Sequence, residues 1–298
     1  MVLVLFLVSR ILGTAAFIAI LIAIYKIPIL ILSWKYKKTE YFIQTHTPYI
    51  CMLRDKGRKG EYFTYRSLTA LPGYKKFLFN CYLPKNDGAT TELDIILLHE
   101  SGIYIFESKN YSGWIFGSEN QQQWTQSLPA GRGKSHKEHF LNPIIQNKVH
   151  LKWLREFIGK ELPMFSYIIF SDRCTLKNVT LTSEAHHVIN RYDILAAVKQ
   201  NTIRVEKALS AQDIDDLYNS LYPLTQTKEE DRLKHIENIQ LKYTPPQAPI
   251  EVHLEEKVCP RCEGKLILRT AAKGERMGKE FWGCSNYPKC RYIENIDK

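Results

Sequence analysis

Two motifs of common enzyme classes are missing from this chain of 298 residues. There is no Gly-rich phosphate loop of the Walker type and no Gly-x-Ser-x-Gly elbow, so we expect no ATP-driven activity and no nucleotide cofactor. Acidic residues are also in deficit, because 31 Asp and Glu stand against 41 Lys and Arg and give a formal net charge of +10. This excess favours a polyanionic partner, either nucleic acid or an anionic membrane face.

Cysteine is too sparse for a disulfide framework, with seven residues in the whole chain. Three of the seven, Cys51, Cys81 and Cys174, are scattered, and we interpret them as ordinary buried or free thiols. The other four form two short hooks, CPRC and CSNYPKC, near the C-terminus. Two such hooks on either side of a β-like stretch can bind one Zn²⁺ tetrahedrally. The predicted zinc ligands are Cys259, Cys262, Cys284 and Cys290.

The tail that carries these hooks has too little apolar content for a core of its own, so zinc binding would supply its folding free energy. Thiolate ligands also need a reducing compartment, which favours the cytosol.

A nearly unbroken apolar stretch at 11–33 predicts a transmembrane helix. At ~1.5 Å per residue it is long enough for a hydrocarbon core of ~30 Å, and its one internal charge is Lys26. An alternative span starts near Val2 and includes Arg10. A cleaved signal peptide is the competing interpretation, although no small-x-small cleavage site follows the stretch.

The charges after this stretch predict its orientation. Lys35, Lys37 and Lys38 follow it directly, and the positive-inside rule then places the rest of the chain in the cytoplasm. We therefore expect a single-pass anchor in the cell membrane at 1–34, in contact with the lipid bilayer. A basic juxtamembrane segment at 35–56 would follow it.

The central part, 57–222, mixes helical and strand patterns, which predicts an α/β fold with helices on both sides of a sheet. Strands are expected at 77–83, 92–98, 102–110, 113–117 and 165–171. Helices are expected at 60–71, 142–161, 191–200 and 211–222, and a loop at 121–134. Two histidine pairs, His136 with His139 and His186 with His187, are interpreted as surface residues rather than metal ligands.

Three charged residues interrupt two otherwise apolar strands. If 92–98 and 102–110 form a hairpin, Asp94 faces Glu107, and Lys109 points to the same side because side chains alternate along a strand. Two opposed carboxylates repel each other unless a cation lies between them, and Mg²⁺ or Mn²⁺ suits such a pair. The alternative is a solvated hairpin face on which these charges have no function.

Several segments resemble the nuclease-related domain, NERD, a branch of the PD-(D/E)xK phosphodiesterase superfamily with a restriction-endonuclease-like fold. They are Gly60-Glu61, ELDIILL at 92–98, GIYIFESKNYSGWIFG at 102–117, WTQ at 124–126 and NPIIQNKVHLKWL at 142–154. The resemblance covers roughly 57–170. It implies a metal-dependent nuclease site, although the proline that leads the superfamily motif is absent and Leu93 precedes Asp94.

The resemblance also implies a role for each site residue. Asp94 and Glu107 would be metal ligands and Lys109 the catalytic lysine. Glu61 would be a further acidic residue near the metal, and Gln146 a site residue on the helix that follows the sheet. The alternatives are that Glu61 is an ordinary first-turn acid of a helix and that Gln146 faces solvent.

Beyond a polar, Pro-rich linker at 223–256, residues 257–298 resemble the C-terminal zinc ribbons of bacterial type IA topoisomerases, which bind single-stranded DNA. Basic residues for phosphates interleave here with aromatic faces for bases. The predicted contacts are Arg261, Lys265, Arg269, Lys279, Trp282, Tyr287, Lys289 and Arg291. The alternative is a ribbon used only for protein contacts.

Together these features predict a membrane-tethered, Mg²⁺-dependent nuclease that faces the cytoplasm and holds DNA through its zinc ribbon. The rival hypothesis is a non-catalytic DNA-binding or scaffold protein at the membrane.

Overall fold

The computed structural model describes residues 10, 14, 17, 23–24, 26–131, 133–227, 257–271 and 280–295. The chain divides into two compact units, 1–238 and 239–298. Nearly all of the expected linker at 223–256 lies outside the described residues, as does Lys279.

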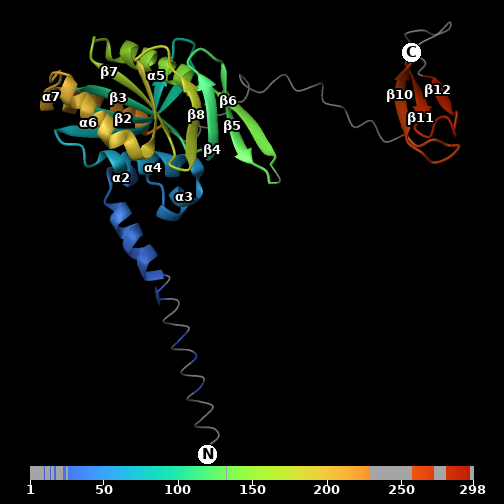
Figure 1. Ribbon diagram of the computed structural model, residues 1–298, viewed down its shortest axis with the longest axis horizontal. Coiled ribbons are helices and arrows are strands. Elements are labelled where there is room, and N and C mark those ends of the chain that lie inside the picture. The colour runs from blue at the N-terminus through green and yellow to red at the C-terminus, as the bar shows by residue number, and fades with distance from the viewer. Residues whose placement is uncertain are drawn as a thin grey trace, which may run out of the picture. The chain divides into compact units, whose positions relative to one another are not determined.

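The larger unit is built on a five-stranded mixed sheet with the order β1-β2-β3-β7-β9 (Figure 1). Its strands are β1 (Lys75–Pro84), β2 (Thr90–His99), β3 (Gly102–Lys109), β7 (Met164–Phe170) and β9 (His186–Asn190). The first three strands pair antiparallel, and β3, β7 and β9 pair parallel. The sequence-based prediction of a mixed α/β fold is therefore confirmed.

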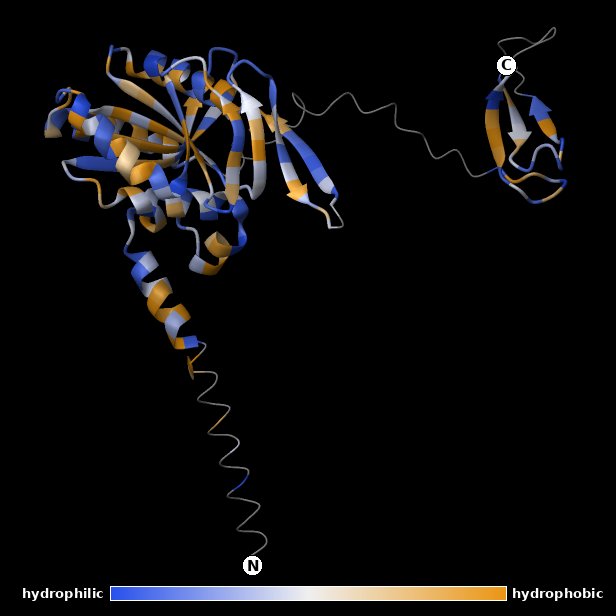
Figure 2. Ribbon diagram, viewed as in Figure 1, coloured by the Kyte–Doolittle hydropathy of each residue, from blue (hydrophilic) through white to orange (hydrophobic). Residues whose placement is uncertain are grey.

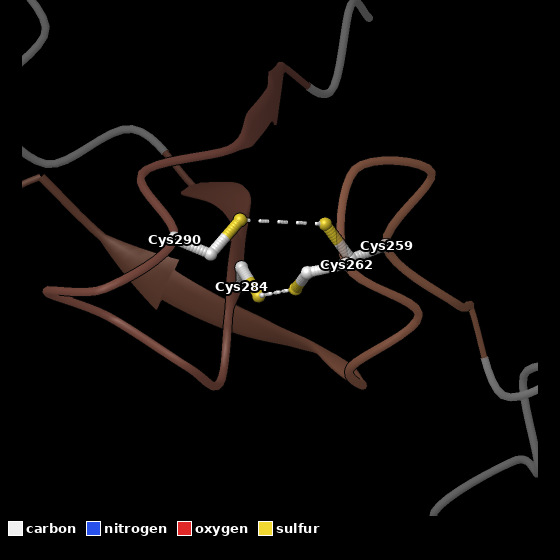
Figure 3. Close-up of side chains that lie close together, drawn as sticks. All are labelled: Cys259, Cys262, Cys284 and Cys290. Carbon is white, nitrogen blue, oxygen red and sulfur yellow. Dashed lines mark hydrogen bonds between the residues drawn. The ribbon is translucent and has the colours of Figure 1, made fainter.

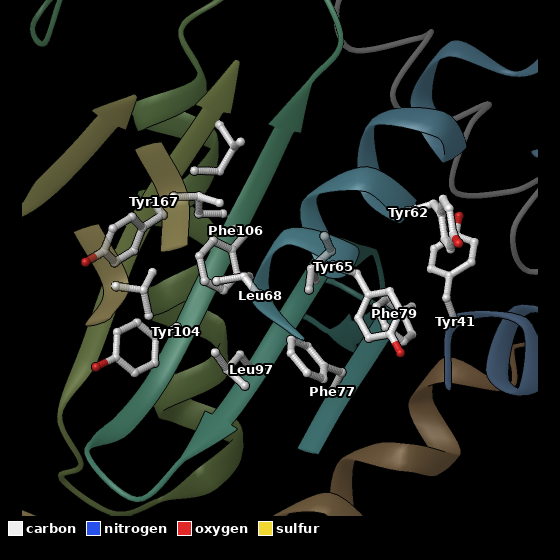
Figure 4. Close-up of a cluster of buried hydrophobic side chains, with 14 of the residues drawn as sticks. Tyr41, Tyr62, Tyr65, Leu68, Phe77, Phe79, Leu97, Tyr104, Phe106 and Tyr167 are labelled. Carbon is white, nitrogen blue, oxygen red and sulfur yellow. The ribbon is translucent and has the colours of Figure 1, made fainter. Parts of the chain in front are cut away.

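Helices cover both faces of this sheet. They are α2 (Glu40–Thr45), α3 (Tyr49–Arg54), α4 (Lys56–Leu68), α5 (Pro143–Ile158), α6 (Ile194–Arg204) and α7 (Ala211–Leu221), with short 3₁₀ turns η1 (Arg191–Asp193) and η2 (Tyr222–Thr225). On one face α4 and α6 bury aromatic and aliphatic side chains, among them Tyr65, Phe79 and Phe106 (Figure 4). On the other face α5 and α7 pack against Ile96 and Ile105. The sheet is thus the middle of three layers.

Helix α4 starts earlier than the sequence indicated. Its N-cap is Asp55, whose carboxylate accepts a hydrogen bond from the backbone N–H of Arg58, and the helix ends at Leu68 before the predicted Pro72-Gly73 stop. This boundary matters for the site, because it moves Glu61 from the first turn of the helix into the second.

A second sheet corrects the loop expected at 121–134. Its order is β6-β5-β4-β8, with strands β4 (Gly113–Ser118), β5 (Gln123–Pro129), β6 (Ser135–Leu141) and β8 (Cys174–Thr180). The residues of β5 alternate between buried and exposed positions, with Trp124 and Gln126 buried and Gln123 exposed. The Gln-rich composition of the segment concealed this alternation in the sequence. The amide of Gln126 donates to the backbone oxygen of Ser112, so its burial leaves the amide donor satisfied.

The prediction that two histidine pairs are surface residues is correct for one pair and wrong for a member of the other. His136 and His139 are exposed as expected, although they lie on strand β6 rather than in a loop. The surface assignment of His186 is wrong, because it is buried and its Nδ1 lies 2.8 Å from Ser166 Oγ. His187 is half-buried and stacks on Tyr167. All of Cys51, Cys81 and Cys174 are free thiols, and the last two are buried, as predicted.

The residues before α2 are described only in part. Residues 26–37 form a helix that carries many hydrophobic residues (Figure 2). The side chains of Ile27, Leu30 and Trp34 on it are exposed. Among the described residues, no helix is both long and apolar enough to span a bilayer. About half of the span expected at 11–33 lies outside the described residues, as does the start of its alternative near Val2.

The smaller unit is a three-stranded antiparallel sheet of β10 (Leu266–Thr270), β11 (Glu280–Cys284) and β12 (Ile293–Asn295). Its described core consists of Cys259, Cys284, Cys290 and Leu266, flanked by Trp282 and Tyr292. So small a core supports the expectation that a metal contributes to folding.

The close approach of Gly117 to Trp124 gives a test of the second sheet. A Cβ at Gly117 would lie 2.3 Å from the indole Cγ of fully buried Trp124. We expect Gly117→Ala to destabilise the protein by about 1–3 kcal/mol through overpacking. Ser135→Ala on exposed β6 is the control and should change stability by less than about 0.5 kcal/mol. Equal urea midpoints for the two variants would contradict this packing.

Candidate functional site

The candidate active site begins where β2 and β3 separate. Their pairing ends at Ile95 opposite Phe106. Beyond this point β2 continues along β1 to the Pro84–Thr90 pair, and β3 continues along β7 to the Lys109–Phe170 pair. The sheet therefore opens into a fork at the level of Asp94 and Glu107, the next residues in the register.

Asp94 spans this fork. Its Oδ2 accepts a hydrogen bond of 2.9 Å from the backbone N–H of Ser108 on β3. The hairpin register that the sequence predicted is confirmed at Leu98 opposite Ile103. The same register, continued, brings Asp94 to Glu107, and the hydrogen bond shows that the Asp94 side chain reaches β3.

Glu107 is buried, and two cationic or polar side chains contact its carboxylate. Lys109 Nζ lies 2.7 Å from Oε1, and His150 Nε2 lies 3.2 Å from Oε2. The other ring nitrogen of His150, Nδ1, lies 2.8 Å from Thr91 Oγ1. The imidazole is therefore held at both nitrogens and fixes the orientation of Glu107.

The sequence analysis did not identify His150. A signal for it was present, because His150 lies four residues after Gln146 on the same helix, and residues at this spacing share a face. A predicted site residue at Gln146 therefore implied a second residue one turn further along α5.

Glu61 reaches the site from the opposite layer. It is the sixth residue of α4, so the interpretation as a first-turn acid is wrong. Its Oε2 accepts a hydrogen bond of 2.9 Å from the hydroxyl of Tyr41. The preceding Gly60 permits close contact with β3, since a Cβ there would lie 2.9 Å from Ser108 Oγ and 3.1 Å from Asn110 Cβ.

The electrostatics of the cluster follow from burial and from the pairing of its charges. Burial, and then the negative charges of Glu107 and Glu61, raise the pKa of Asp94 well above its usual range. Burial also raises the pKa of Glu61 to about 7, and the charge of Glu92 adds to this effect. Burial alone would raise the pKa of Glu107, but the Lys109 ammonium and His150 outweigh it and lower the value to about 2.

Gln146 is half-buried on α5, and its Oε1 is a buried atom without a hydrogen-bond partner among the described residues. This argues against the solvent-facing alternative. The neighbouring Asn147 donates through Nδ2 to Ile105 O and Ser166 Oγ, but its Oδ1 is also buried without a hydrogen-bond partner among the described residues. Gln146 lies one turn before His150 on α5, so the two residues share a helix face, and the ring of His150 contacts Glu107. An orphaned acceptor on that face is a group that a cation or a bound water would satisfy.

These donors fit a hard divalent cation. Carboxylate and amide oxygens are the ligands that Mg²⁺ and Mn²⁺ prefer, and Asp94, Glu107 and Gln146 supply them. Each carboxylate oxygen has two lone pairs, so the contacts to Ser108, Lys109 and His150 leave acceptor capacity. The raised pKa of Asp94 has the same implication, because a cation would relieve its repulsion from Glu107.

The second candidate site is the group of four cysteines in the smaller unit (Figure 3). The Sγ atoms of Cys259, Cys262, Cys284 and Cys290 all lie within 4.8 Å of one another. Two of the separations are 3.8 Å, between Cys259 and Cys290, and 3.4 Å, between Cys262 and Cys284. Tetrahedral zinc with Zn–S bonds of ~2.3 Å requires S–S separations of roughly this size. The four thiols therefore fit one zinc ion.

Local hydrogen bonds favour the thiolate form of Cys262, whereas at Cys284 and at Cys290 a backbone hydrogen bond is outweighed by burial and the neighbouring thiols, which raise the pKa of each thiol. The backbone N–H of Asn286 points at Cys284 Sγ at 3.4 Å, and its side-chain amide points at Cys262 Sγ at 3.5 Å. A hydrogen bond to the backbone of Gly264 is the main reason that the pKa of Cys262 falls to about 6. N–H donors around a cysteine stabilise its ionised form, which is the form that binds metal.

The predicted DNA contacts of the ribbon are mostly at its surface. Exposed members are Arg261, Lys265, Arg269, Tyr287, Lys289 and Arg291. Arg269 lies over the ring of Tyr287 at 6.0 Å, and Tyr287 is 60% exposed. Trp282 is half-buried against the core, so only part of its ring is available.

Comparison with known proteins identifies a family for each of two segments of the chain. Residues 56–171 match the nuclease-related domain, and residues 256–298 match the topoisomerase DNA-binding C4 zinc finger. The first match points to a nuclease-type hydrolase and the second to DNA binding. No solved structure matches the chain significantly.

Two curated proteins are similar to parts of the chain. DNA topoisomerase 1 of Methanocaldococcus jannaschii is 47% identical over 53 residues, which are 18% of this chain and 6% of that protein. An uncharacterized protein of Bacillus anthracis is 30% identical over 189 residues, which are 63% of this chain and 85% of that protein. The chain therefore belongs to the same family as the Bacillus anthracis protein, and it joins a nuclease-related domain to a topoisomerase-type C4 zinc ribbon.

Proposed function

We propose that this protein is a membrane-tethered nuclease that uses Mg²⁺ or Mn²⁺ to hydrolyse DNA phosphodiester bonds. The observation that carries the proposal is the convergence of Asp94, Glu107 and Lys109 at the fork between β2 and β3. The mixed sheet with helices on both faces supports a restriction-endonuclease-like fold for the domain.

In this proposal Asp94 and Glu107 hold the divalent cation, with Glu61 and Gln146 beside it. When bound, the cation would polarise the scissile phosphate and lower the pKa of a bound water. Lys109 orients the attacking water and balances the negative charge that develops on the phosphate oxygens. His150 holds the carboxylate of Glu107 in place through its bond to Oε2.

The zinc ribbon has a separate task in this proposal. Its exposed arginines and lysines contact phosphates, and Tyr287 and part of Trp282 stack on bases of single-stranded DNA. Because both units belong to one chain, binding at the ribbon raises the local concentration of DNA at the nuclease domain.

Removal of the lysine amine tests the catalytic role. We expect Lys109→Ala to lower the rate of DNA cleavage by at least about 10²-fold, since the amine acts on the reacting atoms. Binding of the same DNA should remain within about twofold of wild type. The measurement is cleavage of a labelled DNA with Mg²⁺ or Mn²⁺, together with a binding titration without either metal.

Lys177→Ala on exposed β8 is the matched control and should cleave at the wild-type rate. The rival scaffold function predicts DNA binding by wild type without metal-dependent cleavage of any DNA or RNA form. That result would remove the nuclease assignment.

Zinc removal tests the ribbon. We expect one Zn²⁺ per chain in wild type and none in Cys284→Ser, because the loss of one thiolate opens a four-ligand site. The variant should lose most of its affinity for single-stranded DNA, while Cys51→Ser, at an exposed thiol outside the cluster, should keep both zinc and binding. Zinc retained at full stoichiometry in Cys284→Ser would contradict the four-thiolate site.

The tether is the third part of the proposal. It is supported by the apolar sequence at 11–33 and by the exposed side chains of Ile27, Leu30 and Trp34 on the described helix at 26–37. Lys38 Nζ lies 3.5 Å above the ring of Trp34, a pairing typical of a membrane interface.

Deletion of residues 1–34 tests the tether. The full chain should sediment with cell membranes and resist extraction by carbonate, because the apolar segment partitions into the bilayer. The shortened chain should appear in the soluble fraction with unchanged zinc content. A full chain that fractionates with soluble proteins would refute the tether.

A further inference from the structure

A basic groove on the nuclease domain lies next to the candidate active site. Its volume is about 550 Å³, and its lining includes Lys59, Phe63, Arg66, Asn110, Arg173 and Arg191. Four of the lining side chains are cationic and one, Asp172, is anionic, so the lining has a formal excess of three positive charges. The lining includes none of Glu61, Asp94 and Glu107, the carboxylates of the candidate active site.

The groove and the active site share two structural elements. Lys59 and Glu61 flank Gly60 on α4, and Asn110 directly follows Lys109 at the end of β3. Asn110 Nδ2 also donates a 2.6 Å hydrogen bond to Lys56 O and joins the two elements. The elements that line the groove therefore continue directly into residues of the candidate active site.

One wall of the groove is a row on α4. Lys59, Phe63 and Arg66 are spaced four and three residues apart, so they share one face of the helix. The row is about 10 Å long at ~1.5 Å per residue. DNA carries one phosphate per ~3.4 Å of helix axis on each strand, so a row of this length matches two or three successive phosphates.

The other wall is held rigidly by its own contacts. Arg173 donates to the backbone and side-chain oxygens of Asn110 at 3.1 and 3.0 Å. Arg191 pairs with Asp172 at 2.6 Å, and its guanidinium lies 5.4 Å from the ring centroid of Phe63. In the part of the chain that the structure describes, no ion pair joins Lys59 or Arg66 to a carboxylate, so both cations are available to a ligand.

We propose that this groove binds the phosphodiester backbone of the nucleic acid strand and leads it to the fork between β2 and β3. Lys59 and Arg66 contact the phosphates, and Arg173 and Arg191 form the opposite positive wall. The inference rests on the proposed nuclease function, because it assigns to that site the surface that positions its substrate. It adds to the domain a DNA contact independent of the zinc ribbon.

The test compares two charge reversals of equal size in the full chain. Lys59→Glu/Arg66→Glu alters the groove, and Lys199→Glu/Arg204→Glu alters exposed cations on α6 that do not line it. The probe is a fluorescent single-stranded oligonucleotide in buffer without Mg²⁺ or Mn²⁺. The groove variant should bind at least tenfold more weakly than the control variant. Its slope of log K against log salt should be smaller by about 1.4, which corresponds to two phosphate contacts.

If a thermal melt shows that Lys59→Glu/Arg66→Glu is not folded at the assay temperature, Lys59→Ala/Arg66→Ala and Lys199→Ala/Arg204→Ala replace the two charge reversals. The groove variant should again bind the oligonucleotide more weakly than the control variant. Equal affinities and slopes for groove and control variants would overturn the proposal. So would a loss confined to co-sedimentation with anionic phospholipid vesicles, because the groove would then bind lipid headgroups. Since binding is measured without cleavage, a wild type that binds through the groove but cuts nothing would refute the nuclease function alone.

Discussion

The divergence of β2 and β3 beyond Ile95 and Phe106 is the constraint on which the candidate site depends. Each strand keeps its other neighbour past this point, so backbone pairing continues on the outer sides while the inner sides lose their partner. Asp94 uses its side chain to replace one missing backbone acceptor, at Ser108 N. The opening thus places polar groups in the middle of a sheet whose neighbouring strand positions are apolar and buried.

Charges in such a place are costly unless they are paired and hydrogen-bonded. The sheet and α5 supply partners for Glu107, since Lys109 comes from β3 itself and His150 comes from α5. Glu61, from α4 on the other face, instead adds negative charge that helps to raise the pKa of Asp94. Glu107 is fully compensated by two of these groups, whereas Asp94 keeps a raised pKa and Gln146 keeps an unsatisfied oxygen. The incomplete part of the site is the part that a divalent cation would complete.

Much of this arrangement could be predicted where the side chains along a strand alternate clearly between its two faces. The hairpin of β2 and β3 follows from alternation about a short turn, and the two cysteine hooks follow from spacing alone. Of the second sheet the sequence predicted the strand β4, but β5 was missed because Gln and Gly residues concealed the alternation of Trp124 and Gln126. His150 and the buried position of His186 were missed for a different reason. The spacing of four residues from Gln146 pointed to the helix face that carries His150, but the contacts with Glu107 and Ser166 are tertiary and no local pattern reveals them.

Direct titration of Mn²⁺ into the zinc-loaded protein tests most directly whether the carboxylates at the fork share a cation. The account predicts one Mn²⁺ per chain, followed by calorimetry or electron paramagnetic resonance, and its loss in both Asp94→Asn and Glu107→Gln. Gln212→Ala, at an exposed side chain of α7, should leave it unchanged. No Mn²⁺ bound at millimolar concentration, or the same binding in wild type and both carboxylate variants, would contradict the account.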